Sequence, residues 1–129
     1  MSLVTQKHTK RILVVDDVAD NLFLLQFLLE TQGHTVNTAE SGAAALAQIE
    51  TELVKPDLII LDLMMPRMNG YEVISHLRSH QDLFNIPILL MTADNNVSDR
   101  KAKDVGADGI LYKPVDLEQI LTGVESFST

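Results

Sequence analysis

Four short apolar runs, each no longer than a strand, constrain the fold of this chain more than any other feature. They lack the alternation of polar and apolar residues that a half-exposed strand shows, and runs of this kind are typical of strands buried on both faces of a parallel sheet. They occupy residues 12–15, 58–61, 86–91 and 110–112. A fifth, mixed run at residues 34–39 is weaker and predicts an edge strand.

Amphipathic segments separate these runs and predict five helices. The alternation predicts an α/β protein of the (βα)5 type, with a parallel five-stranded sheet, right-handed crossovers and helices on both faces. Because the weak strand comes second, we expect the flavodoxin-like order 2-1-3-4-5, in which ligands bind at the carboxyl ends of the first and third strands. The predicted helices span residues 19–32, 42–53, 71–80, 97–105 and 116–126.

The length of 129 residues predicts one domain, which we place at residues 11–129 after an N-terminal extension at residues 1–10. No apolar run approaches the roughly 20 residues that span a bilayer, and the N-terminus lacks the apolar core of a signal peptide. With no cysteine as well, a cytoplasmic protein without a membrane partner is expected. The net charge of −8 argues against binding nucleic acid.

Polar side chains stand at the predicted strand ends. Asp16 and Asp17 follow the first strand, Asp62 ends the third, Thr92 the fourth and Lys113 the fifth. The carboxyl ends of parallel strands meet at one edge of the sheet, so these residues are expected to converge. Three carboxylates about 5 Å apart would repel one another by about 3 kcal/mol per pair at an effective dielectric constant of about 20.

A divalent cation would offset this repulsion, and an open site with few protein oxygens suits Mg²⁺ (or Mn²⁺). The alternative is that a raised pKa keeps one acid protonated. A carboxylate beside such a metal can attack phosphorus and form an aspartyl phosphate. We therefore predict phosphoryl transfer onto Asp62, with Lys113 supplying positive charge and Thr92 a hydroxyl. Alone, each residue also fits a structural role; together they favour a site.

Several short motifs, in this order and spacing, resemble the receiver domains of two-component response regulators, including the chemotaxis regulators. The resemblance extends from residue 11 to about residue 125. The motifs are VVDDxxxN at 14–21, LDLMMPRMNG at 61–70, MTA at 91–93, GAD at 106–108 and KP at 113–114.

The resemblance implies a role for each site residue. Asp62 corresponds to the phospho-acceptor, which takes its phosphoryl group from a phosphohistidine on a histidine kinase or histidine phosphotransfer protein. Asp17 is expected to bind Mg²⁺ directly, Asp16 partly through water, and Met64 through its backbone carbonyl. Lys113 is expected to contact the phosphoryl group.

The resemblance also implies a switch. Thr92 would move toward the phosphoryl oxygen, and in many receivers an aromatic residue three positions before the lysine swings inward. Here that position is Ile110, and the tyrosine is Tyr112. We therefore predict only a muted rotamer change at Ile110. The partner surface that responds to phosphorylation is expected at residues 97–105, 110–112 and 116–126.

The first predicted helix carries two phenylalanines, Phe23 and Phe27, one turn apart. A helical projection places them on the side away from the sheet, which suggests a docking surface for the phosphodonor. Rolling of the helix, or a covering segment, is the alternative. The face expected to pack on the sheet comprises Asn21, Leu24, Leu25, Leu28 and Leu29.

Two other functions are compatible with parts of the pattern. A small phosphatase with an aspartyl nucleophile resembles a DxDxT motif, but the segment LDLMM lacks the second aspartate and the chain has no length for a substrate cap. A receiver-like module that only binds partners would not need the full set of site residues. The sequence therefore predicts a signalling switch, not a conventional enzyme.

Overall fold

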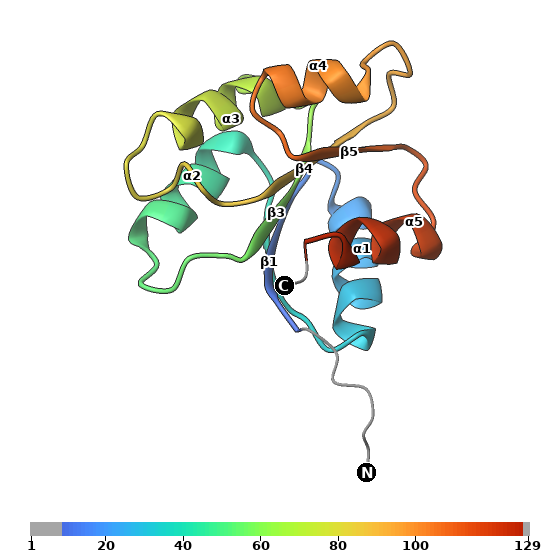
Figure 1. Ribbon diagram of the computed structural model, residues 1–129. Coiled ribbons are helices and arrows are strands. Elements are labelled where there is room, and N and C mark those ends of the chain that lie inside the picture. Colours follow the sequence, from blue (N-terminus) through green and yellow to red (C-terminus); the bar gives the residue numbers. More distant parts are fainter. Residues whose placement is uncertain (1–8, 128–129) are drawn as a thin grey trace.

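The computed structural model describes residues 9–127, and its architecture confirms the predicted fold (Figure 1). Five parallel strands form one sheet of order β2-β1-β3-β4-β5, and a helix follows each strand. The predicted extension lies outside the described residues except for its last two positions. The elements are β1 (Arg11–Val15), α1 (Ala19–Thr31), β2 (Thr35–Ala39), α2 (Gly42–Thr51), β3 (Leu58–Asp62), α3 (Gly70–Arg78), β4 (Ile88–Thr92), α4 (Asp99–Asp104), β5 (Gly109–Tyr112) and α5 (Leu117–Glu125).

Helices cover both faces of the sheet, with α1 and α5 on one side and α2, α3 and α4 on the other (Figure 1). Successive strand residues point to opposite faces, so β1 divides between two cores. Leu13 and Val15 join the core under α2, α3 and α4, whereas Ile12 and Val14 join the core under α1 and α5. Burial on both faces explains why these runs show no polar alternation.

Local signals fix most helix ends. The side chain of Ser41 accepts a hydrogen bond from the backbone N–H of Ala44 at the start of α2, and capping boxes open α3 and α5. Gly33 and Gly106 have φ values of 93° and 108° just past the ends of α1 and α4, which is the left-handed backbone that glycine allows at a helix C-terminus. β4 starts at Ile88 and not at residue 86, since Pro87 has no N–H to donate.

Helix α1 is rotated relative to the prediction. Leu24, expected on the sheet-facing side, is 52% exposed, while Leu22, outside the predicted set, is buried with Leu25 and Leu29. The helix is apolar on almost all sides, so the projection had no clear polar side from which to fix its rotation. Among residues 9–127, no helix is both long and apolar enough to cross a membrane.

Candidate functional site

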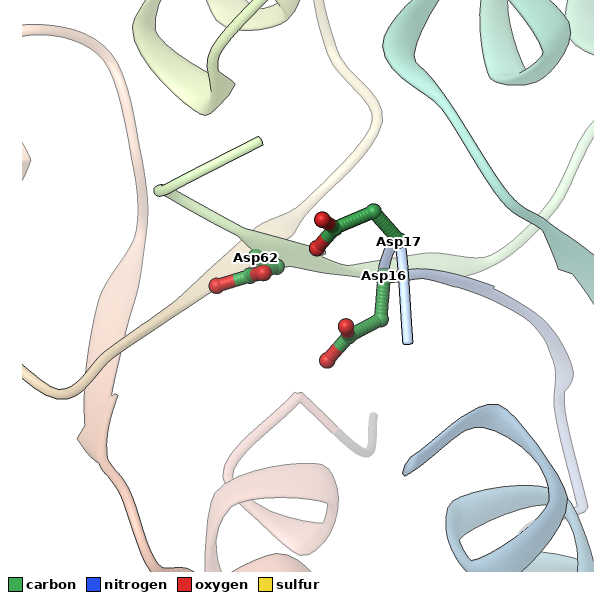
Figure 2. Close-up of side chains that lie close together, drawn as sticks. All are labelled: Asp16, Asp17 and Asp62. Carbon is green, nitrogen blue, oxygen red and sulfur yellow. The ribbon is translucent and has the colours of Figure 1, made fainter. Parts of the chain in front are cut away.

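Three carboxylates meet at the carboxyl edge of the sheet, and we call them the acid cluster: Asp16, Asp17 and Asp62. One oxygen of each lies within 4.8 Å of the others (Figure 2). The sheet produces this convergence because Val15 of β1 pairs with Leu61 of β3, so both strands end at the same level. Such a group of hard oxygen donors fits a divalent cation.

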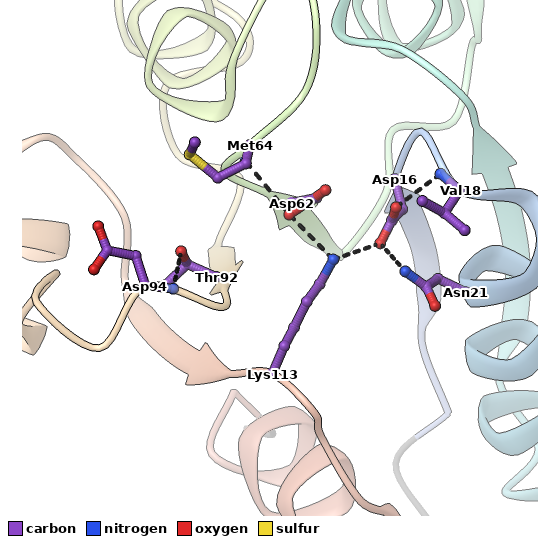
Figure 3. A network of polar contacts seen from close by, with 8 residues as sticks. All are labelled: Asp16, Val18, Asn21, Asp62, Met64, Thr92, Asp94 and Lys113. Carbon is purple, nitrogen blue, oxygen red and sulfur yellow. Dashed lines mark hydrogen bonds and ion pairs between the residues drawn. The ribbon is translucent and has the colours of Figure 1, made fainter.

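Lys113 reaches the acid cluster from the end of β5, more than fifty residues after Asp62 in the sequence (Figure 3). Its Nζ lies 3.0 Å from Oδ2 of Asp16 and 3.3 Å from Oδ1 of Asp62. The backbone N–H of Lys113 donates to the carbonyl of Thr92 at 2.8 Å, and the peptide bond to Pro114 is cis. The lysine therefore bridges the acids that end two different strands.

The two neighbouring aspartates have different surroundings. Asp16 is completely buried, and its carboxylate accepts hydrogen bonds from the backbone N–H of Val18 at 2.9 Å and from Nδ2 of Asn21 at 3.2 Å, in addition to Lys113. Asp17 is exposed. Asp16 is thus committed to protein donors, whereas Asp17 presents its carboxylate to solvent.

Opposing effects set the charges at the site. Burial, and then the negative charge of Asp16, raise the pKa of Asp62, although Lys113 and the N–H of Met64 counteract this. Burial on its own would lower the pKa of Lys113, but the hydrogen bond to Asp16 and the charges of Asp62 and Asp16 raise it. Lys113 is therefore a stable cation beside a carboxylate whose ionised form is disfavoured.

Thr92, Met64 and Asp94 complete the surroundings of Asp62 (Figure 3). Thr92 is fully buried at the end of β4, the strand next to β3, and its hydroxyl accepts the backbone N–H of Asp94 at 3.0 Å. The N–H of Met64 lies 3.4 Å from Oδ1 of Asp62, and Met64 itself is 66% exposed. Ile110 is half-buried and packs against the core under α2, α3 and α4.

A pocket of about 320 Å³ opens beside Lys113, between α1 and the segment after β5. Its polar wall comprises Asp16, Asn21 and Lys113. Sequence patterns did not reveal this pocket, because its wall combines residues of α1 with residues that follow the site lysine. Its remaining lining is apolar: Leu24, Leu25, Leu28, Met91, Ala93, Pro114 and Val115.

Phe23 and Phe27 lie on the solvent side of α1, as predicted, with exposed fractions of 73% and 56%. With Leu24 they form an exposed apolar surface, which we call the α1 patch. Leu24 belongs both to this patch and to the lining of the pocket, so the two are continuous. Sequence analysis missed Leu24 because it assigned that residue to the core.

The chain belongs to the family of response regulator receiver domains, whose model matches residues 12–125. It is 42% identical over 118 residues to the alkaline phosphatase synthesis transcriptional regulatory protein PhoP of Bacillus subtilis, covering 91% of this chain and 48% of that protein. It is also 46% identical over 112 residues to the response regulator MprA of Mycobacterium ulcerans, covering 86% and 47%. The chain thus spans about half the length of the curated relatives it matches.

Solved structures of receiver domains match this chain over most of their own length. The chemotaxis response regulator CheY4 of Vibrio cholerae superposes with a TM-score of 0.84 at 31% identity, covering 92% of this chain and 98% of that chain. The signal receiver domain of a signal transduction histidine kinase from Syntrophus aciditrophicus superposes with a TM-score of 0.80 at 30% identity, covering 92% and 89%. The family accordingly implies a cognate histidine kinase as partner.

Proposed function

We propose that this domain is a phospho-acceptor switch of a two-component phosphorelay, phosphorylated on Asp62 by a phosphohistidine donor. The observation that carries the proposal is the position of Asp62. Its carboxylate is almost completely buried at a strand end, 3.3 Å from the ammonium group of Lys113 and beside the carboxylates of Asp16 and Asp17. Such an arrangement both orients a nucleophile and supplies the charges that phosphoryl transfer requires.

In the proposed reaction, a carboxylate oxygen of Asp62 attacks the phosphorus atom of the donor phosphohistidine. The new bond joins that oxygen to phosphorus, and the phosphorus–nitrogen bond breaks. The imidazole leaves with the bonding electrons and takes up a proton. Lys113 holds a positive charge 3.3 Å from Asp62 and stabilises negative charge on the transferred phosphoryl oxygens.

The donor set of the acid cluster fits Mg²⁺ or Mn²⁺, which when bound would neutralise charge on the phosphoryl oxygens. We assign Asp17 as a direct ligand, since it is exposed and Asp16 already accepts three hydrogen bonds. Asp16 would act partly through water. Asp62 and the backbone carbonyl of Met64 complete the proposed protein ligands.

Thr92 is the proposed switch residue, whose hydroxyl turns toward the phosphoryl group. Its movement would alter the surface formed by α4, β5 and α5, which we propose as the contact surface for an output partner. Ile110, which lies on β5, would change its rotamer only slightly. The domain would act as a switch that catalyses its own phosphorylation and dephosphorylation, and not as a conventional enzyme.

The α1 patch is the proposed contact for the histidine kinase or histidine phosphotransfer protein. An exposed apolar surface on a helix is suited to packing against another helix. The pocket that adjoins the patch is lined by Lys113, whose Nζ lies 3.3 Å from Asp62. A donor packed on Phe23 and Phe27 would therefore present its imidazole at this edge of the sheet. We further propose that the domain acts in the cytoplasm and binds neither nucleic acid nor membrane.

Incubation with acetyl phosphate and Mg²⁺, followed by intact mass measurement, tests the assignment of Asp62. We expect one added phosphoryl group, lost in Asp62→Asn and on chelation of the metal. Release of free phosphate from many monoesters would support a phosphatase instead. Absence of labelling under all conditions would support a module that only binds partners.

Replacing both Phe23 and Phe27 with glutamate tests the α1 patch. Phosphotransfer from a cognate phosphohistidine donor is expected to slow about tenfold or more, because two aromatic contacts that the donor would bury are lost. Labelling by acetyl phosphate, which needs no docking surface, should be unchanged. Equal loss of both activities would show that the substitutions disturb the fold.

A further inference from the structure

A series of hydrogen bonds connects Thr92 to Tyr112 through the loop at residues 93–98. The hydroxyl of Thr92 accepts from the backbone N–H of Asp94 at 3.0 Å (Figure 3). The carbonyl of Asp94 accepts from the N–H of Val97 at 3.2 Å. The carbonyl of Val97 in turn accepts from the hydroxyl of Tyr112 at 2.5 Å. The loop is therefore held at one end by Thr92 and at the other by Tyr112.

Tyr112 is well placed for this contact because it stands opposite Thr92 in the pairing of β4 with β5. It also directly precedes Lys113. Ile110, two residues earlier, points to the same face of the strand, but its aliphatic side chain packs into the core and cannot form a hydrogen bond. The polar link between β5 and the loop therefore passes through Tyr112.

The hydrogen bond between Tyr112 and Val97, which we call the Tyr112 tether, also reaches the start of α4. The side chain of Val97 is buried in the core under α2, α3 and α4. Ser98, the next residue, is the N-cap of α4, and its hydroxyl accepts from the N–H of Lys101 at 2.9 Å. A displacement of Val97 consequently displaces the beginning of α4.

The Thr92 hydroxyl cannot change rotamer without affecting this series. A rotation of its side chain moves the oxygen to a different staggered position and takes the acceptor away from the N–H of Asp94. The loop must then rearrange to give Asp94 a new partner, because an unpaired N–H at a part-buried position is unfavourable. Any such rearrangement acts on the carbonyl of Val97, which the tether holds.

We infer that Tyr112 is a positioning residue whose hydrogen bond to Val97 stabilises the resting arrangement of loop 93–98 and opposes the movement of Thr92. This inference rests on the proposed function, since it assumes that Thr92 turns toward a phosphoryl group on Asp62. It assigns the coupling between site and loop to the residue that directly precedes the site lysine. The tether therefore determines how often loop 93–98 of the unphosphorylated domain adopts the arrangement of the phosphorylated one.

The experiment compares Tyr112→Phe with Tyr71→Phe, which removes the hydroxyl of the only other tyrosine in the chain. Beryllofluoride with Mg²⁺ serves as a mimic of the phosphoryl group on Asp62, and its binding is titrated by the NMR signals of Asp94 and Val97. Tyr112→Phe is expected to bind it about two- to tenfold more tightly than the wild type, the effect of losing one hydrogen bond from the resting state. Tyr71→Phe is expected to match the wild type.

Amide hydrogen exchange without any ligand tests the tether separately. In Tyr112→Phe the amide of Val97 should exchange faster than in the wild type, by about the same two- to tenfold factor. An amide in the middle of β3, such as that of Ile60, should exchange at the wild-type rate. Faster exchange at both positions would mean general destabilisation and would overturn the inference.

Unchanged exchange at Val97 in Tyr112→Phe would also overturn the inference, as would equal or weaker binding of beryllofluoride. If the wild type itself shows no binding that Asp62→Asn abolishes, the proposed function fails. The exchange experiment still decides whether Tyr112 holds the loop. The two failures are therefore distinguishable.

Discussion

At the amino end of β4 a single guanidinium group pairs with several acceptors, whereas at its carboxyl end three carboxylates lie close together and one ammonium group contacts two of them. Arg78 donates from Nε to the carbonyl of Gly106 at 2.8 Å, and from Nη1 to the carbonyls of Phe84 and Ile86 at 2.7 and 2.8 Å. Its Nη2 lies 2.9 Å from Asp108. At the other end, Lys113 bridges two acids, and burial raises the pKa of one of them, Asp62.

The difference separates what stabilises the domain from what we propose makes it work. Around Arg78 every charge meets an opposite charge or a carbonyl dipole, which favours one fixed arrangement. In the acid cluster, three like charges remain close together and Lys113 contacts only two of them, so the remaining repulsion is relieved by a bound cation or a proton. The amino end should therefore respond strongly to mutation, and the carboxyl end should respond strongly to solution conditions.

The largest effect is expected from Arg78→Ala, which would leave three carbonyls without their arginine donor and Asp108 with only the N–H of Ile88. We predict a loss of about 2–3 kcal/mol in the free energy of unfolding, measured with urea. The ion pair with Asp108 contributes little of this, because the aspartate side chain is 44% exposed and solvent screens the pair. Arg100→Ala, at an exposed position of α4, should change stability by less than about 0.5 kcal/mol. A similar loss of unfolding free energy in both variants would show that the contacts of Arg78 do not stabilise the amino end of β4 specifically.

Asp62→Asn should change the free energy of unfolding in the opposite direction and stabilise the metal-free domain. The folded protein raises the pKa of Asp62 above its ordinary value, so folding favours the protonated form, and stability is lost as pH rises through the folded pKa. The variant cannot ionise, and its advantage should grow across this range and then stay constant. At pH 7 we expect its Tm to exceed that of the wild type by roughly a few degrees, by calorimetry.

Addition of Mg²⁺ supplies the control for this prediction. Saturating metal should raise the Tm of the wild type more than that of Asp62→Asn, because the wild type has the larger repulsion to relieve. An Asp62→Asn protein that is less stable than the wild type without metal would mean that the contact of Asp62 with Lys113 outweighs the repulsion from Asp16.

The smallest effect is expected at Arg67, in the loop that follows β3. Arg67 has a φ of 67°, and the N–H of Met68 donates to the carbonyl of Pro66 at 2.7 Å, which closes a tight three-residue turn. A side chain in this region of backbone space is unfavourable, and glycine adopts it without that cost. Arg67→Gly should raise the free energy of unfolding by up to about 1 kcal/mol, partly offset by greater freedom of the unfolded chain. A loss of stability would show that the arginine side chain makes a stabilising contact.

The acid cluster was predictable because its members end strands. Asp16, Asp17 and Asp62 follow apolar runs, and parallel strands bring such ends together regardless of their separation in sequence. The contacts of Arg78 were not predictable, since its acceptors are mainly backbone carbonyls, which any residue type can supply. For the same reason, the hydrogen bond from Tyr112 to the carbonyl of Val97 could not be predicted from residue types.

The rotation of α1 could not be predicted for a different reason. Leu22 and Leu24 are chemically identical, and only packing against the sheet determines which of them is buried. A helix with a polar side would have removed the ambiguity, but α1 has leucine or phenylalanine on most of its surface. The exposed phenylalanines were nevertheless placed correctly, because the opposite face had to carry the leucines that fill the core.

Strand β3 is buried along all five of its residues and lies between β1 and β4. Asp62 is its last residue, so a group added there is attached to a fully buried strand that has a paired strand on each side. The acyl phosphate would carry roughly one and a half to two negative charges in place of the single charge of the carboxylate, at the end of a strand that moves little. The central strand would thus stay in place while the surrounding loops rearrange. The speed of signalling would then be limited by the loops and not by the sheet.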